Sequence, residues 1–216
     1  MRRLVGILFM LLGAVTIFFS GLLLMNNRQE DRAAQVFAED VMPQIYEQIH
    51  STPETVGETE AVSEVPEYTP AEFLKPEDLA MTEKTIKGYS YIGYLTIPEL
   101  NLELPVMSDW DSKRLQISPC RYTGTVKGED LVIMAHNFRS HFGQLPQLAV
   151  GSAVQFVDMD GKVWHYEVAA MDVLAAESVE EMTSGEYDLT LFTCAKNRTH
   201  RVTVRCNMTE KPSYTE

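Results

Sequence analysis

The feature that most restricts the folding of this chain is an uncharged segment close to its N-terminus. After Met1-Arg2-Arg3, the 22 residues from Leu4 to Met25 carry no charged side chain. As an α-helix this segment is about 33 Å long, which is enough to cross the hydrocarbon core of a bilayer. A cleaved signal peptide usually has an apolar stretch of about 7–15 residues and a small-x-small cleavage site, and residues 18–25 offer no clear site. We therefore expect an uncleaved membrane anchor over residues 1–26, with a cleaved signal peptide as the alternative.

The charges beside the anchor bear on its orientation. Arg2 and Arg3 precede the apolar segment, and a signal anchor of this kind keeps its N-terminus in the cytoplasm. Arg28 and Arg32 follow the segment, so the contrast in positive charge between its two ends is small. We expect a single-pass protein of the cell membrane with a cytoplasmic N-terminus and an extracellular main domain.

Two segments of different character follow the anchor. In residues 27–50 apolar side chains recur at helical spacing, which predicts a juxtamembrane helix that is bent or broken at Pro43. Its apolar positions are Val36, Phe37, Val41, Ile45 and Ile49. Residues 51–86 are acidic, and nine Asp or Glu residues and four prolines lie between positions 51 and 85. Such a composition buries too little apolar surface to offset the entropy of the chain, which predicts an extended or disordered stalk.

The remaining part of the chain has the size of one ordinary domain, residues 87–210, followed by a short C-terminal tail, residues 211–216. The formal net charge of −13 argues against a nucleic-acid partner. The sequence has no Gly-rich phosphate loop and no Cys/His metal spacing, so we expect neither a cofactor nor a metal. Three cysteines in an extracellular chain leave at least one free thiol, and Cys120 and Cys206 are either a disulfide or two buried thiols.

Short strands dominate the pattern of this domain. Alternating or continuous apolar runs predict strands at 91–98, 102–106, 131–135, 153–157, 163–168, 188–194 and 201–205. Asp160-Gly161 predicts a hairpin turn between two of them. Residues 111–117 are expected to form a helical turn and residues 177–182 a short helix. Many short strands with little helix indicate a closed or nearly closed β-barrel.

One cysteine stands where two predicted strands meet. Cys194 ends the strand 188–194, and Arg201 begins the next strand after a polar connection of six residues. A thiol at the exit of one strand then faces a guanidinium at the entrance of the next. Because the thiolate is the nucleophilic form and a nearby cation favours it, Cys194 is the candidate nucleophile and Arg201 the candidate cation.

A nucleophilic thiol usually works with a histidine as acid and base. The chain has five histidines: His50, His136, His141, His165 and His200. His50 lies at the stalk region, and His165 lies inside an alternating strand. His200 lies beside Arg201 and projects from the opposite face of that strand. His136 directly follows the most apolar strand, so it meets Cys194 at one sheet edge if their two strands are parallel neighbours. We therefore favour His136 over His141, which lies in the following loop.

These motifs resemble the sortase family. Thr190-Leu191-Phe192-Thr193-Cys194 matches the TLxTC signature of sortases, and Tyr91–Pro98 is similar to their first core strand. Ala135-His136-Asn137 stands where sortases carry the catalytic histidine, and Arg201 where they carry the catalytic arginine. The resemblance covers residues 88 to 207 and implies a closed β-barrel of about eight strands with short helices, preceded by a transmembrane helix. Ala135 replaces a glycine of many sortases, and the subclass stays open.

The resemblance also implies an activity. Sortases are cysteine transpeptidases of Gram-positive bacteria that cleave an LPxTG-like sorting signal of a surface protein or pilin through a thioester. An amine, such as that of a peptidoglycan precursor, then resolves the thioester. Cys194 would be the nucleophile, His136 the acid for the leaving amine, and Arg201 a donor to the oxyanion, with the backbone N–H of Ala195 as a second donor. Thr193 would shape the site.

Two further side chains and two other functions belong to this set of expectations. Met134 and Phe192 would line a groove for the Leu-Pro part of the signal, or they are ordinary core residues. The first alternative function is a surface cysteine hydrolase or peptidase, in which water replaces the amine; an L,D-transpeptidase is disfavoured because the chain lacks a Ser-x-Gly-Cys motif. The second alternative is a non-catalytic surface binding module, in which Cys194 is an inert core thiol.

Overall fold

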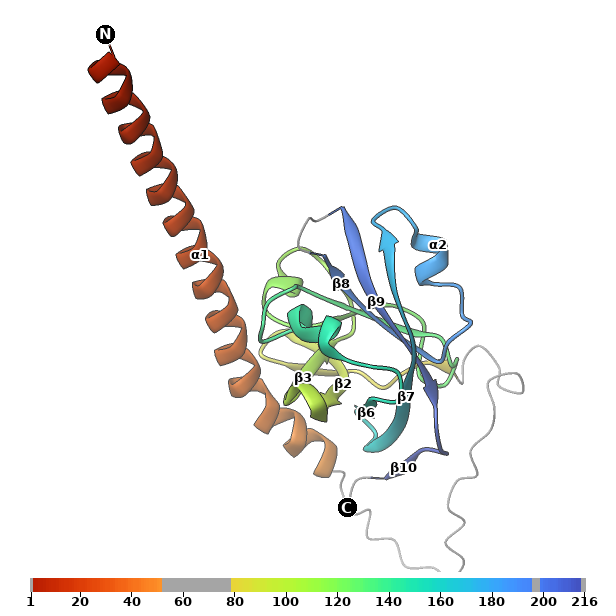
Figure 1. Cartoon of the computed structure of the whole chain (residues 1–216). Helices are drawn as coiled ribbons and strands as arrows, with labels where there is room; N and C mark the ends of the chain where they lie inside the picture. The colour runs from red at the N-terminus through yellow and green to blue at the C-terminus, as the bar shows by residue number, and fades with distance from the viewer. Residues whose placement is uncertain (1, 52–78, 196–198, 215–216) are drawn as a thin grey trace, which may run out of the picture.

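The computed structural model describes residues 2–51, 79–195 and 199–214, and shows a long N-terminal helix beside a β-barrel (Figure 1). Its helices are α1 (Arg2–His50) and α2 (Val179–Met182), with 3-10 turns η3 (Pro98–Leu100), η4 (Arg114–Gln116) and η5 (Phe142–Gln147). Its strands are β1 (Lys84–Ile86), β2 (Tyr89–Ile97), β3 (Leu102–Met107), β4 (Cys120–Thr123), β5 (Leu131–Ala135), β6 (Ala153–Asp158), β7 (Lys162–Ala175), β8 (Leu189–Cys194), β9 (His200–Met208) and β10 (Ser213–Tyr214).

The barrel closes through β6. The strand order is β1-β2-β3-β4-β5-β8-β9-β7-β10, and β6 pairs with both β2 and β7. A ring of eight strands, β2-β3-β4-β5-β8-β9-β7-β6, therefore has no open edge, which removes the unpaired backbone groups that an edge strand exposes. This confirms the closed barrel of about eight strands. The two remaining strands, β1 and β10, lie outside the ring.

A glycine allows the ring to close at β2. Gly93 pairs with Val106 of β3 and with Asp158 of β6, next to a bulge in β2. Its φ is 147°, and a Cβ at this position would lie 2.0 Å from the carbonyl oxygen of Val157. Any other residue would force β2 and β6 apart, so the close approach of the two strands requires glycine here.

The hairpin between β6 and β7 forms where Asp160-Gly161 predicts it. The buried carboxylate of Asp158 accepts hydrogen bonds from the backbone N–H groups of Asp160 and Lys162 and from the indole N–H of Trp164. Burial raises the pKa of Asp158, against the effect of these three donors. The carboxylate thereby fixes both the turn and the large side chain of Trp164 in the core.

The sequence pattern underestimates two strands and misses three. β7 continues to Ala175, because its second half pairs with β9. The pattern missed this half because residues 169–175 do not alternate cleanly between apolar and polar side chains. β4 is short and contains Arg121, so its pattern does not indicate a strand. β9 extends to Met208. β1 lies inside the segment predicted as stalk, and β10 lies in the predicted tail.

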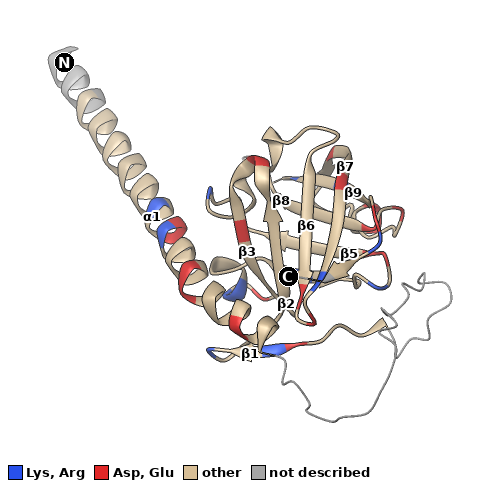
Figure 2. Ribbon diagram, turned by 90° about the horizontal axis from the view of Figure 1, so that it is seen from below, with Lys and Arg blue, Asp and Glu red and all other residues tan. Residues whose placement is uncertain are grey.

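The helix α1 has two halves with different surroundings. Large apolar side chains between Met10 and Met25 are exposed, and Figure 2 shows no charged residue in this stretch of the helix. By length and composition α1 is a candidate membrane span near the N-terminus. Pro43 does not end the helix, and its second half packs against the barrel. The helix is therefore not broken at Pro43, and of the two predicted outcomes the bend stays a prediction.

The second half of α1 contributes to the core of the molecule. Its buried side chains are Ala34, Ala38, Val41, Met42, Ile45 and Ile49. The last four pack against Ile86, Tyr91, Met107 and Met159, among other residues of the barrel wall. Val36, which the sequence places in the same apolar stripe, is 63% exposed. The acidic segment between α1 and β1 lies largely outside the described residues, and the limit of the domain at residue 86 stays a prediction.

Candidate active site

The residues proposed from the sequence lie at one rim of the barrel, where β5 and β8 end and β9 begins. β5 and β8 are parallel neighbours, and their last paired residues are Ala135 and Thr193. His136 and Cys194 directly follow this pair, so both leave the sheet at the same edge. The structure thereby meets the condition on which the choice of His136 rests.

Arg201 reaches the same edge from the other side of β8. In the antiparallel pairing of β8 with β9, the Cα partner of Cys194 is Arg201. Directly opposite residues of an antiparallel pair project from the same face of the sheet. Cys194 and Arg201 therefore share one face, and both are partly exposed. His200 projects the other way, and its ring is hydrogen-bonded with the side chain of Thr199.

Thr193 joins the ends of β5 and β8. Its buried hydroxyl donates a hydrogen bond of 2.8 Å to the carbonyl oxygen of Ala135, the residue before His136. The bond crosses the parallel pair at its last rung, where fraying would begin. Thr193 therefore holds the peptide that precedes His136 against the peptide that precedes Cys194.

A second apolar cluster lies on the outer face of the barrel, on the same side as Cys194. In β8 the side chains of Leu189 and Leu191 face the barrel interior, so alternation puts Phe192 and Cys194 on the outer face. Phe192 is buried there with Val132 and Met182, and Tyr122, Met134 and Leu174 pack around them. Met134 and Phe192 are therefore part of an outer apolar surface that leads to Cys194, rather than of the barrel core.

Two aromatic residues that sequence reasoning missed extend this surface. Tyr122 meets the ring of Phe192 edge-on at 5.4 Å, and Trp110 stacks on Tyr122 at 5.7 Å. Trp110 is 47% exposed, which is unusual for so large an apolar side chain. Its exposure could have been suspected from the polar loop Ser108-Asp109-Trp110-Asp111, but its contact with Tyr122 follows only from the fold.

Arg205 was also missed, and it holds the segment between β7 and β8. Its guanidinium is buried and donates to the carbonyl oxygens of Glu181 and Met182 at the end of α2. It also donates to the hydroxyl of Thr190 and lies over the ring of Tyr187. Because Met182 packs on Phe192, Arg205 fixes one wall of the outer apolar surface.

The backbone N–H of Ala195 is already engaged. It donates a hydrogen bond of 2.9 Å to the carbonyl oxygen of His200, which closes the β8–β9 hairpin. A donor to an oxyanion must point into the site and be available. This N–H would have to give up its bond first, so we do not retain Ala195 as an oxyanion donor.

His141 is separated from the thiol chemistry by burial. Its side chain is fully buried, and neither ring nitrogen makes a hydrogen bond of ordinary geometry among the described residues. Burial, with a smaller effect of His136, lowers the pKa of His141 to about 4, although Asp31 and the backbone of Ile117 act in the opposite direction. A buried, neutral imidazole agrees with the preference for His136.

The other two cysteines are buried free thiols in different clusters. Cys120 packs with residues of α1 and the barrel wall, whereas Cys206 lies in the barrel core. Burial raises the pKa of each thiol to about 12, so neither is a thiolate at neutral pH. Of the two possibilities that the sequence left open, the structure shows the pair of buried thiols.

Comparison with known proteins identifies the family of the chain. The family profile described as Sortase domain matches residues 95–209, and the chain belongs to the sortase family. No curated protein matches the chain.

Solved structures of sortases have the same fold. Sortase C1 from Streptococcus suis is 27% identical with a TM-score of 0.50, over 56% of this chain and 74% of that one. Sortase C1 from Streptococcus agalactiae is 23% identical with a TM-score of 0.50, over 59% and 72% of the two chains. Sortase C from Clostridium perfringens SM101 is 21% identical with a TM-score of 0.51 and covers 84% of this chain and 92% of its own.

Proposed function

We propose that this protein is a membrane-anchored transpeptidase that cleaves an LPxTG-like sorting signal and joins the surface protein to an amine. The observation that carries the proposal is the register of β5, β8 and β9, which brings His136, Cys194 and Arg201 to one sheet edge inside a sortase domain. No cofactor is needed for this chemistry.

In the first half-reaction the thiolate of Cys194 attacks the carbonyl carbon of Thr in the Thr–Gly peptide bond of the signal. The carbonyl electron pair moves to the oxygen, and the guanidinium of Arg201 stabilises the resulting oxyanion. The oxyanion then collapses, the C–N bond breaks, and the imidazolium of His136 gives its proton to the leaving amine. The products are a thioester on Cys194 and the released C-terminal fragment.

The second half-reaction reverses this sequence with a different amine. His136, now neutral, takes a proton from the attacking amine as its nitrogen adds to the thioester carbonyl. The intermediate expels the thiolate of Cys194, and a new amide bond replaces the old one. The bond that forms is equivalent to the bond that breaks, so no oxidant or energy source is consumed. The acceptor is proposed to be a peptidoglycan precursor or a pilin.

The outer apolar surface is the proposed binding region for the Leu-Pro part of the signal. Phe192 and Met134 form its floor, Tyr122 and Trp110 form one side, and the end of α2 forms the other. Thr193 lies beneath this surface and acts on the geometry of the site through Ala135. The candidate membrane span in α1 supports a place at the cell membrane. The proposed orientation, with the N-terminus in the cytoplasm and the barrel outside, rests on Arg2 and Arg3 before the apolar segment.

The proposal is tested by incubating the full chain, in detergent micelles, with a library of sorting-signal peptides, with and without candidate amines. We expect cleavage between Thr and Gly and, with an amine, a ligated product identified by mass. Hydrolysis that no amine diverts would favour the surface hydrolase. Absence of any product together with a Cys194 thiol that resists alkylation in the folded protein would favour the binding module.

A further inference from the structure

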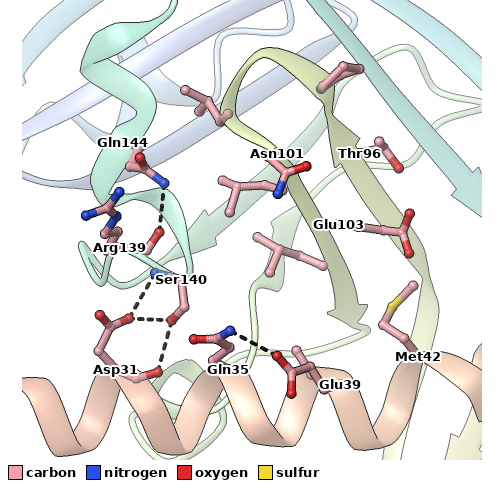
Figure 3. A pocket seen from close by; sticks show the side chains of 15 residues that line it. Asp31, Gln35, Glu39, Met42, Thr96, Asn101, Glu103, Arg139, Ser140 and Gln144 are labelled. Carbon is pink, nitrogen blue, oxygen red and sulfur yellow. Dashed lines mark hydrogen bonds between the residues drawn. The ribbon is translucent and has the colours of Figure 1, made fainter.

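The membrane helix contacts the loop that follows His136. The backbone N–H of Ser140 donates a hydrogen bond of 2.9 Å to Oδ1 of Asp31, and the hydroxyl of Ser140 lies 3.1 Å from the carbonyl oxygen of Asp31 and 2.5 Å from its carboxylate. Figure 3 shows these bonds joining α1 to the loop from below. The two residues are 109 positions apart, and one side chain of α1 thus binds both polar groups of Ser140.

The loop between His136 and η5 is folded tightly, so that Ser140 and His136 form one unit. The N–H of Phe142 donates to the carbonyl oxygen of His136, and the ring of His136 stacks on Phe138 at 4.8 Å. The N–H groups of His141 and Gly143 both donate to the carbonyl oxygen of Phe138. A Cβ on Gly143 would lie 2.5 Å from the carbonyl oxygen of Asn137, so the loop has no spare room. A shift of Ser140 is therefore transmitted to the backbone and ring of His136.

The helix that carries Asp31 is fixed to the barrel independently of this contact. Val41, Ile45 and Ile49 are buried against the barrel wall, which holds α1 about three to five turns beyond Asp31. Ion pairing of Asp40 with Lys87 adds a polar contact in the same region. Asp31 therefore lies on a helix whose position is fixed by other contacts, so its hydrogen bonds to Ser140 can restrain the loop.

We propose that Asp31 is a positioning residue for His136, so that the membrane-anchored helix completes the active site. This inference rests on the proposed function, in which His136 moves the proton. Asp31 lies six residues after Met25, or about 9 Å along the helix, so the loop that it restrains lies close to the predicted end of the membrane span. The distance between the site and the membrane is then set by helix α1 and not by the acidic segment 51–86.

The test compares variants of the full chain in detergent micelles. Asp31→Ala removes the acceptor, and Glu39→Ala is the matched control. Glu39 lies on the same helix and lines the same cavity of about 720 Å³, but its carboxylate accepts only from Gln35 of its own helix in the described contacts. We expect Asp31→Ala to lower kcat about tenfold with KM changed less than about twofold, and Glu39→Ala to keep both within about twofold of the parent.

Four further measurements separate positioning from a general loss of structure. Asp31→Asn keeps the acceptor oxygen and should recover most of the lost kcat, whereas Asp31→Ala should leave the alkylation rate of Cys194 unchanged. Adding Ser140→Ala to Asp31→Ala should cost little more than Asp31→Ala alone, because only the contact of the Ser140 hydroxyl with the backbone carbonyl oxygen of Asp31 is left to remove. Backbone hydrogen exchange in residues 136–143 should be faster in Asp31→Ala than in Glu39→Ala.

The outcomes distinguish the two proposals. If the parent protein ligates a sorting peptide and Asp31→Ala is as active as Glu39→Ala, the positioning role is wrong and the transpeptidase stands. If the parent protein has no such activity, the proposed function fails, and the hydrogen-exchange comparison still decides whether Asp31 orders the loop. Equal exchange in the two variants contradicts the inference in either case.

Discussion

Three side chains define the chemistry proposed for this protein, and Arg201 is the one whose role depends most on shape. Arg201→Lys keeps a positive charge but replaces the planar guanidinium by a single flexible ammonium. We expect kcat to fall by about 10²–10³, the usual effect of losing one oxyanion donor, with an unchanged unfolding temperature. Steady-state kinetics with a sorting peptide measure this, and parent-like turnover would contradict an oxyanion role.

The hydroxyl of Thr193 should matter more than that of a second buried threonine. Thr193→Val removes the buried hydroxyl that donates to the carbonyl oxygen of Ala135, and the loss of such a hydrogen bond costs about 0.5–1.5 kcal/mol. The control is Thr203→Val, because the buried hydroxyl of Thr203 has no hydrogen-bond partner among the described residues. We expect Thr203→Val to be neutral or stabilising in thermal unfolding and to retain turnover. An equal loss in both variants would show that the bond to Ala135 has no special role.

His141 should make the stability of the protein depend on pH. Its pKa is about 4 when folded and about 6.5 when unfolded, so the unfolded chain takes up a proton between these values and the folded chain does not. The free energy of unfolding therefore falls as pH drops from about 6.5 to 4, by about 3 kcal/mol in all. The unfolding temperature of His141→Phe should fall less than that of the parent between pH 7 and pH 5. Parallel pH profiles would contradict a buried neutral His141.

The sequence predicted the three catalytic candidates because each stands at the end of a strand with a clear apolar pattern. Asp31 was beyond reach, since nothing local to Asp31 or Ser140 indicates a contact across 109 positions. Trp110 and Tyr122 were missed for a similar reason, because their stacking depends on the parallel pairing of β3 with β4. This pairing consists of one residue pair, Met107 and Cys120.

Among the elements, the segment that connects β7 to β8 depends on one buried cation. Arg205→Met removes the donor to the end of α2 and leaves the carbonyl oxygens of Glu181 and Met182 without it. We expect a loss of about 2–4 kcal/mol in the free energy of unfolding and faster hydrogen exchange in residues 176–188. Arg205→Lys should not restore stability, because one ammonium cannot reach the same set of acceptors. Full recovery by lysine would show that charge alone suffices.

Strands were predictable where their own sequence has a clear apolar pattern. They were not predictable where only pairing with a neighbouring strand stabilises them. β5 was placed residue for residue from its continuous apolar run. The second half of β7 was missed because its partner β9 stabilises a stretch whose own sequence, Ala169-Ala170-Met171-Asp172, indicates little. β1 was missed because Lys84-Thr85-Ile86 follows an acidic segment and forms a strand only as an addition to β2.

At the scale of the whole molecule, α1 is both a candidate membrane span and a part of the folded domain. Ile45→Ala removes a fully buried side chain at the helix–barrel interface and should lower the free energy of unfolding by about 2–5 kcal/mol. Val36→Ala, on the same helix but 63% exposed, should change it by less than about 0.5 kcal/mol. Thermal unfolding of the full chain in micelles measures both. Equal effects would mean that the second half of α1 does not pack on the barrel in solution.

The helical stripe was predicted from the sequence, but its partner was not. The pattern of Val41, Ile45 and Ile49 indicates a buried face without saying what covers it, and the barrel wall that does so is assembled from several strands. The acidic composition of residues 51–86 suggested a spacer between membrane and domain. Direct packing of α1 on the barrel instead brings the domain to the helix before that segment begins.

The central claim is that Cys194, His136 and Arg201 form one transpeptidase site. The most direct measurement is mass spectrometry of the full chain after mixing with a sorting-signal peptide, first without and then with an amine. The account predicts an adduct of the N-terminal peptide fragment on Cys194 that disappears as an amine-ligated product forms, and no adduct in Cys194→Ala. An unmodified Cys194, or an equal yield of product from Cys194→Ala, would contradict it.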